Sequence, residues 1–458
     1  MFIFPLIYLS TCLITIKEFL KGNRQAVLLF LIFGLSIYTT SMSVVFKLGF
    51  GSSIGFLQSF KELLIITLLG WNLYTYKNQI KLHFIDYAIL TFFFYTFIYA
   101  LLPIGNQSFV TKIFAFKSVS FFGLVYFASR FFDIKKIFIN KYFFFILILS
   151  ILAAIVVIYE FITNQHLQTK TGYANFNYYL FNFDTSGSYG LSWTFETSTG
   201  LKRFASFFAN PLEHAAATLI SLAVLASFYT NDLYKFKLDT FGFIAFCATF
   251  ISILFAVSRS SFISYFVLIY AYGYFTNKKY IPKIAHTAFV IVALYLFYLI
   301  TKDFDRNSSI LELIVSTLNF SDSSSVGHVL EWVQGVTAIY ENPLGLGLGN
   351  SGVVAGSLGE NIGGENQFII IGVQVGIIAL IIYISIYISI IRNARYWYYR
   401  LEGKEKKVCL AILLIKISFI IPLLTSEIET SSYISYMIWF LTGIFVNMIA
   451  NKSEKIND

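Results

Sequence analysis

Three arginine residues of this chain lie outside the short loops that hold most of its basic residues, and they are candidates for binding an anion. Arg203 comes shortly before Asn210 and Pro211, where Asn is a favourable N-cap and Pro a favourable first residue of a helix. Backbone N–H groups at a helix start attract negative charge, and a guanidinium can bind phosphate through two hydrogen bonds. Arg203 is therefore a candidate phosphate ligand, with snorkelling to lipid headgroups as the alternative. Arg259 and Arg306 are the other two arginines of this kind.

A carboxylate and an amide follow the glycine pair Gly363 and Gly364, directly before a long apolar run. Glu365 at this position could accept a proton from a hydroxyl nucleophile, which is the task of a general base. The alternative is that Glu365 only caps the next helix or compensates its dipole. Asn366 beside it is a candidate substrate-binding residue.

A short amphipathic helix is predicted from Val326 to Glu341. His328 and Glu331 share one face of this helix at i, i+3 spacing. Trp332 is a possible membrane anchor, as in helices that lie in the membrane interface. The apolar face consists of Val326, Leu330, Val333, Val336 and Tyr340.

Three further patterns lie in the polar segments. Trp193 belongs to a group of aromatic residues among Asn, Ser and Gly, which could pack on sugar rings or form an interfacial aromatic belt. The glycine run from Gly345 to Gly349 could present backbone N–H groups to a phosphate, although flexible loops contain such runs more often. Asp303 and Asp305 could hold a metal ion, but two acids in a loop often occur by chance, so no metal is expected.

The elements that must position these residues are membrane-spanning helices. The 458-residue chain is 57% hydrophobic and 12% charged, with a mean hydropathy of +0.72, which excludes an ordinary soluble protein. Its apolar runs, from Phe2–Ile16 to Tyr433–Ala450, predict an all-α polytopic membrane protein of about thirteen spans. We treat residues 1–458 as a single membrane domain.

Charge alternates between successive connecting segments, and this predicts the orientation. Most of the 33 Lys and Arg residues lie in one set of short loops, which the positive-inside rule places in the cytoplasm together with the C-terminus. The net charge of +9 is explained by topology, so no nucleic-acid partner is expected. The N-terminus and two long segments, 163–211 and 301–367, then face outward, where ATP and nucleotide sugars are absent. Arg259 falls in a short outer connection between spans, where a charge is costly without a function or a partner.

These motifs, taken in order, resemble the bacterial O-antigen polymerase and O-antigen ligase superfamily of membrane glycosyltransferases. The resemblance covers the C-terminal half and agrees with the predicted topology. Two positions depart from the ligase pattern: Glu365 stands where ligases usually have histidine, and His328 stands where many relatives have arginine. The matching features are Arg203 to Pro211, Ser258-Arg259-Ser260, and Gly327-His328, Trp332, Asn342-Pro343, Gly345 and Gly349. Because of the departures at Glu365 and His328, the polymerase branch is favoured over the ligase branch.

The resemblance implies an enzyme of the bacterial cytoplasmic membrane that transfers a growing glycan from an undecaprenyl-pyrophosphate carrier to another lipid-linked repeat unit. The product would be O-antigen, capsular polysaccharide or exopolysaccharide, and no cofactor is expected. Arg203 and Arg259 would neutralise the leaving pyrophosphate, and Glu365 or His328 would be the general base. Expected partners are membrane lipids, a chain-length regulator and a flippase. The expected substrate-binding residues are Arg306, Asn210, Glu331, Trp332, Asn366 and Trp193.

Two alternatives remain open from the sequence. A glycan ligase of the same fold would attach finished polymer to lipid A core, protein or another acceptor. A lipid-linked oligosaccharide flippase would have a similar number of spans and charges that line a central cavity. The charged residues within apolar runs that favour a flippase are Lys61, Glu62, Lys112, Lys117 and Lys416.

Overall fold

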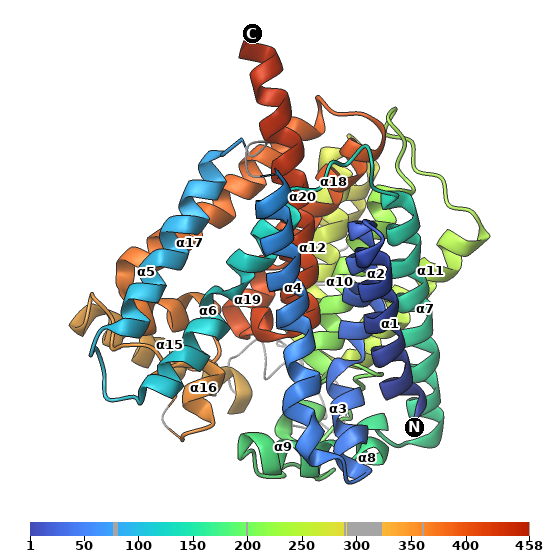
Figure 1. Cartoon of the computed structure of the whole chain (residues 1–458). Helices are drawn as coiled ribbons and strands as arrows, with labels where there is room; N and C mark the ends of the chain where they lie inside the picture. Colours follow the sequence, from blue (N-terminus) through green and yellow to red (C-terminus); the bar gives the residue numbers. More distant parts are fainter. Residues whose placement is uncertain (77–80, 198–199, 288–289, 291–322, 360, 458) are drawn as a thin grey trace.

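Helices make up most of the chain in the computed structural model (Figure 1). The structure describes residues 1–76, 81–197, 200–287, 290, 323–359 and 361–457. Within these ranges, β pairing is limited to two isolated bridges, Glu196 with Lys202 and Thr230 with Phe236. The predicted all-helical class is therefore confirmed for the part that the structure describes.

Nine of the described helices are long and apolar enough to cross a membrane, so the chain is a multi-pass membrane protein. Helices α18 and α19 together form one of the nine candidate spans. The others are formed mainly or wholly by α1, α4, α5, α6, α7, α10, α17 and α20. Their bounds are α1 Ile3–Leu20, α4 Ile54–Tyr76, α5 Phe84–Leu101, α6 Phe109–Ser129, α7 Ile139–Thr163, α10 Pro211–Phe228, α17 Gln367–Tyr398, α18 Gly403–Ser418, α19 Ile420–Thr425 and α20 Ser432–Asn457.

The structure supports nine or ten spans, and the predicted count of thirteen is not confirmed. The tenth candidate is a broken span, 24–34 with α3 (Tyr38–Lys47), whose two parts are bent by 65°. Helices α11 (Thr240–Ala256) and α12 (Arg259–Phe275) have 17 residues each, which is the lower limit for a span, and they are not among these candidates. The predicted run from Ala285 to Ile300 lies almost entirely outside the described residues. Because the two termini lie at opposite ends of the bundle, an odd number of passes is expected (Figure 1).

Small side chains explain which helices occupy the centre of the bundle. In an apolar stretch of 18 residues from each span, 94% of the residues are buried in α20 and 89% in α10, but only 22% in α1. Helix α10 contains the run Ala215 to Ala217, which lets neighbouring backbones approach closely, as is usual between membrane helices. Helices α10 and α20 are therefore central, and α1 faces the surroundings.

Helix α17 is broken at Gly376, and the glycine run 345–349 packs into the break. Gly376 has φ 86° and ψ 174°, a conformation that is essentially limited to glycine. The N–H groups of Leu346 and Gly347 donate to the carbonyls of Val373 (2.7 Å) and Gln374 (3.1 Å). Non-helical backbone at membrane depth needs such partners inside the protein. These two donors of the glycine run therefore bind α17 and are not presented to a phosphate.

The two ends of the bundle differ in content (Figure 1). One end, which we call the basic end, holds the C-terminus and the ends of α1, α4 and α6. The opposite end, which we call the loop end, holds four further helices: α8 (Leu167–Thr171), α9 (Tyr173–Phe181), α15 (Ser323–Glu341) and α16 (Gly352–Gly356). The predicted amphipathic helix corresponds to α15, which begins three residues earlier than expected.

Candidate functional site

Arg203 lies on a backbone segment that buried hydrogen bonds hold in place. The carboxylate of Glu160 on α7 accepts from the N–H of Ser206 at 2.9 Å. The side-chain amide of Gln168 on α8 donates to the carbonyls of Ser206 (2.8 Å) and Phe208 (2.9 Å). Ser206 itself has φ 55°, which is uncommon for a residue other than glycine. Two elements thus fix the loop that carries Arg203, and this is the preorganisation that a binding residue requires.

The helix start predicted after Arg203 is confirmed. Helix α10 begins at Pro211, and the side-chain oxygen of Asn210 accepts from the N–H of Glu213 at 2.9 Å. The Glu213 carboxylate accepts in return from the N–H of Ala209 at 3.1 Å. The side-chain oxygen of Asn210 is therefore engaged in the cap.

The backbone brings Arg203 next to Arg259. The N–H of Phe204 donates to the carbonyl of Phe255 at 3.0 Å, which joins the Arg203 segment to the end of α11. Val257 then takes a left-handed conformation (φ 46°), and α12 begins at Arg259 two residues later. Burial, followed by the charge of Arg259, lowers the pKa of Arg203 to about 10. Arg203 therefore still carries a charge at neutral pH, beside a second guanidinium.

Glu365 lies on a different segment of the chain and interacts electrostatically with Arg203. The loop Gly363–Gly364 packs on α15, and a Cβ added to Gly364 would lie 2.1 Å from a carboxylate oxygen of Glu331. His328 on α15 lies beside Glu331, with 3.7 Å between Nδ1 and Oε2. Desolvation raises the pKa of the Glu365 carboxyl, although the residue is exposed at the protein surface.

Electrostatic effects link these residues into one cluster. The charges of His328 and Arg203 lower the pKa of Glu365, and that of Glu331 raises it. In turn, the charge of Arg259 lowers the pKa of Arg203 and the charge of Glu365 raises it. The structure therefore brings together the four predicted catalytic residues, Arg203, Arg259, Glu365 and His328. They come from four separate segments of the chain.

The remaining predicted substrate-binding residues are placed in different ways. Asn366 is the N-cap of α17, since its side-chain oxygen accepts from the N–H groups of Phe368 and Ile369, so the cap considered for Glu365 belongs to Asn366. Trp332 has a buried indole N–H with no hydrogen-bond partner among the described residues. Trp193 is 69% exposed and begins the short 3-10 helix η5 (Trp193–Phe195) at the loop end. Arg306, like Asp303 and Asp305, lies outside the described residues.

Glu427 is a member of the cluster that the sequence analysis missed. It lies between α19 and the 3-10 helix η6 (Ile428–Thr430), and its carboxylate accepts from the N–H of Val353 at 2.7 Å. Gly352 touches it so closely that a Cβ there would lie 2.9 Å from both carboxylate oxygens. Burial raises the pKa of Glu427 to about 8, with a further contribution from the charge of Glu365. Its only signal in the sequence is an acidic residue shortly before the last apolar run.

The charges that favoured a flippase are engaged with neighbours. Glu62 forms ion pairs with Lys61 (3.1 Å) and Lys117 (2.5 Å). Lys112 donates to the carbonyl of Leu102 at 3.0 Å. The Lys416 ammonium lies 4.0 Å from a carboxylate oxygen of Glu429 and 3.7 Å from the Trp439 ring centroid. These contacts join spans to one another, as buried charges in membrane proteins usually do.

The cluster at the loop end thus combines two guanidinium groups, two carboxyl groups of raised pKa and one imidazole. Such a set can bind an anionic group and move a proton at the same place. The chain matches no protein-family model, and no curated protein matches it.

Proposed function

We propose that this protein is a membrane glycosyltransferase that polymerises undecaprenyl-pyrophosphate-linked oligosaccharide repeat units. It would act on the outer face of a bacterial cytoplasmic membrane and produce O-antigen, capsular polysaccharide or exopolysaccharide. The observation that carries the proposal is the meeting of Arg203, Arg259 and Glu365 at one end of a membrane bundle. The reaction needs cations for a pyrophosphate and a base for a hydroxyl, and this cluster offers both.

In the proposed reaction, a hydroxyl oxygen of the acceptor glycan attacks the anomeric carbon of the donor glycan. The new glycosidic C–O bond forms while the bond from that carbon to the pyrophosphate oxygen breaks. The hydroxyl proton passes to Glu365, and the electron pair of the broken bond leaves with undecaprenyl pyrophosphate. Arg203 and Arg259 stabilise the negative charge that develops on this oxygen, which is electrostatic catalysis by preorganised groups.

The two carboxyl groups suit different tasks. With a pKa of about 8, Glu427 holds its proton at neutral pH, so it can donate a hydrogen bond. The charges of Arg203 and His328 favour the ionised form of Glu365, whereas burial raises its pKa. An ionised carboxylate with a raised pKa is a better base than an ordinary one. Glu365 is therefore the proposed base, and His328 and Glu331 would orient the acceptor.

Helix α15 supports a substrate that is anchored in lipid. Its His328 and Glu331 lie by the cluster, whereas Leu330 (64% exposed), Val333 (59%) and Val336 (58%) point away from the protein. Exposed apolar side chains at the end of a membrane bundle face lipid or its interface. A polyprenyl chain could thus stay in the bilayer while its pyrophosphate reaches Arg203.

The proposed outward orientation follows from the positive-inside rule. Basic residues of the predicted cytoplasmic loops, such as Arg24, Lys81 and Lys136, gather at the basic end. The rule places that end in the cytoplasm, and the site then lies on the opposite side. Glycans on lipid carriers are available there, whereas nucleotide sugars are not.

The test is the polymer produced by a strain that lacks this protein and is complemented with Arg203→Gln, Arg259→Gln or Glu365→Gln. Each variant should reduce the long polymer at least tenfold and leave single repeat units on the carrier. Lys202→Gln is the matched control, because Lys202 is adjacent to Arg203 but donates to Asn164 at 2.6 Å. Wild-type polymer from all three site variants, at equal protein levels, would refute the proposal.

The same strain distinguishes the rival functions. A ligase is indicated by polymer of normal length that is not transferred to its final acceptor. A flippase is indicated by single repeats that accumulate on the inner leaflet, whereas a polymerase defect leaves them on the outer leaflet.

A further inference from the structure

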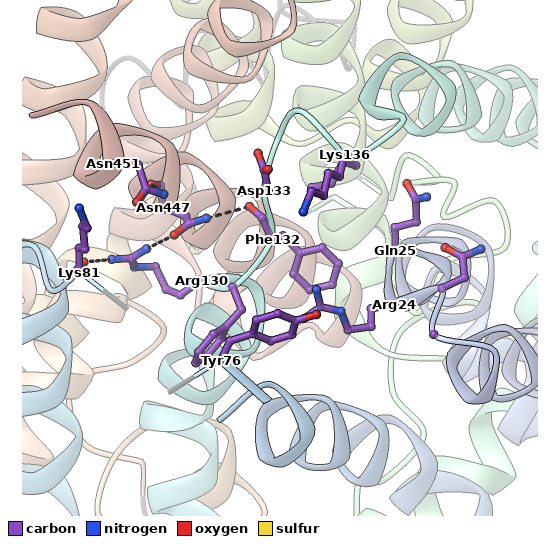
Figure 2. A pocket seen from close by; sticks show the side chains of 14 residues that line it. Arg24, Gln25, Tyr76, Lys81, Arg130, Phe132, Asp133, Lys136, Asn447 and Asn451 are labelled. Carbon is purple, nitrogen blue, oxygen red and sulfur yellow. Dashed lines mark hydrogen bonds between the residues drawn. The ribbon is translucent and has the colours of Figure 1, made fainter. Parts of the chain in front are cut away.

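A cavity of about 620 Å³ lies at the basic end, away from the cluster around Glu365 (Figure 2). Four segments far apart in the sequence form it: the turn after α1, the end of α4, the loop between α6 and α7, and the end of α20. Its size is within the range of small-molecule binding sites.

The floor of the cavity is a rigid and electrically neutral network. Arg130 donates through Nε and Nη2 to the two carboxylate oxygens of Asp86, both at 2.7 Å, and both side chains are fully buried. The remaining Nη1 donates to Asn447 at 2.9 Å, and Nη2 also donates to the carbonyl of Lys81 at 2.8 Å. Asn447 donates in turn to the carbonyl of Phe132 at 3.0 Å (Figure 2). The cavity shape therefore does not depend on a ligand.

The walls of the cavity carry the net positive charge. Arg24, Lys81 and Lys136 line it together with a single acid, Asp133. The two lysines and Asp133 are exposed. Since the Arg130–Asp86 pair is neutral, these wall residues leave an excess of positive charge. An anion is therefore the expected occupant.

Arg24 is oriented like a binding residue. Its guanidinium stacks on the Tyr76 ring at 4.3 Å and lies 5.5 Å from the Phe132 ring centroid. Its Nη1 donates to the side chain of Asn72, whose amide is held by the carbonyl of Ala128 at 2.9 Å. A guanidinium fixed in this way is preorganised to present its other donors to a phosphate group.

The neighbourhood of the cavity favours a phosphate that belongs to a lipid. Leu20 at the end of α1 is 80% exposed, and Leu73 and Tyr74 near the end of α4 are 44% and 85% exposed. These side chains lie at the ends of two membrane spans that contribute to the cavity, so acyl chains can lie against them. Basic pockets between membrane helices at the cytoplasmic side are suited to anionic lipid headgroups.

We propose that this cavity binds a phosphate group, and that an anionic phospholipid of the surrounding leaflet supplies it. Arg24, Lys136 and Lys81 supply the positive charge that attracts the phosphate. The neutral amides of Asn23 and Gln25 are available to the polar part of the headgroup. This site is independent of the proposed glycosyl transfer, because none of its residues belongs to the cluster at the loop end.

The test measures binding of phosphatidylglycerol to the full-length protein in a neutral detergent by native mass spectrometry, with phosphatidylcholine as the neutral comparison. Lys81→Gln with Lys136→Gln should weaken phosphatidylglycerol binding roughly thirtyfold, since each cation near a membrane surface contributes about 1 kcal/mol. Lys235→Gln with Lys237→Gln is the matched control, because it removes the same charge from exposed lysines that do not line the cavity. An equal loss in both double variants, or equal binding of the two lipids, would overturn the proposal.

A second arm identifies the source of the phosphate. Inorganic phosphate and glycerol 3-phosphate are added at millimolar concentration, and the thermal stability of the protein in detergent is compared with that in phosphatidylglycerol. Stabilisation by phosphatidylglycerol alone supports the lipid. Equal stabilisation by the soluble phosphates, lost in Lys81→Gln with Lys136→Gln, would overturn the lipid assignment and identify a soluble phosphate ligand.

Discussion

Replacement of Gly376 by alanine should destabilise the protein, because α17 breaks at this residue. The conformation of Gly376 (φ 86°, ψ 174°) costs an alanine about 1–3 kcal/mol. The added Cβ would also lie 2.6 Å from the carbonyl carbon of Leu344 and 2.7 Å from the carbonyl oxygen of Pro343. That oxygen accepts from the N–H of Ile377 at 2.9 Å, a bond of about 1 kcal/mol that the clash would weaken.

These contributions sum to roughly 2–4 kcal/mol, which corresponds to about a thirtyfold or greater loss in the ratio of folded to unfolded protein. The assay is the fraction of protein that stays monodisperse in detergent after heating over a temperature series. The apparent melting temperature of Gly376→Ala should fall by several degrees. Gly70→Ala is the control, since Gly70 lies within α4 and a Cβ there would meet nothing within 4 Å. Equal stability of the two variants would show that α17 is not broken at Gly376.

Two further predictions concern buried charges. Burial raises the pKa of Glu427 from its ordinary value of 4.5 to about 8, so the folded protein holds this proton more tightly than the unfolded chain. The resulting stabilisation is complete below pH 4.5 and is lost as the pH rises through 8. The half-life of the folded protein in detergent should thus shorten between pH 6 and 9, and Glu427→Gln should flatten this profile; parallel profiles would contradict the assignment. Asp86→Asn should destabilise the protein by about 3–5 kcal/mol, because it leaves the Arg130 charge buried without a partner. In the same heating assay, a variant as stable as the wild type would show that Arg130 finds another counter-ion.

Several features could be predicted because they depend on local sequence or on charge alone. The start of α10 follows from Asn210 and Pro211, which act within one helical turn. The positions of α15 and its two faces follow from a period of 3.6 residues. The charge pattern also separated the basic loops from the segments that carry Arg203 and Glu365. It therefore anticipated that these two residues share one end of the bundle.

Other features depend on contacts between residues that are distant in the sequence, which a hydropathy pattern cannot reveal. The break at Gly376 lies inside a long, mainly apolar run, and only the packing of Leu346 and Gly347 against it shows why the helix is interrupted there. The carboxylate of Glu427 binds the N–H of Val353, 74 residues away in the sequence. The number of spans also depends on helix length, which hydropathy does not give, since the apolar runs at α11 and α12 form helices of only 17 residues, the lower limit for a span.

The arginine residues at the two ends of the bundle have different charged neighbours, and this difference supports the proposed site around Arg203. Arg130 at the basic end is matched by the two carboxylate oxygens of Asp86, so its charge is neutralised within the protein. Arg203 at the loop end lies beside Arg259, whose charge contributes to its lowered pKa. Two like charges in a partly desolvated place repel each other, and the charge of Glu365 counteracts this effect on Arg203. A pyrophosphate that arrives at this position would relieve the repulsion, and its binding would be strongest when its own negative charge is greatest. In the proposed reaction that condition would be met as the glycosidic bond to the carrier breaks, so the arrangement would favour the transition state over the bound substrate.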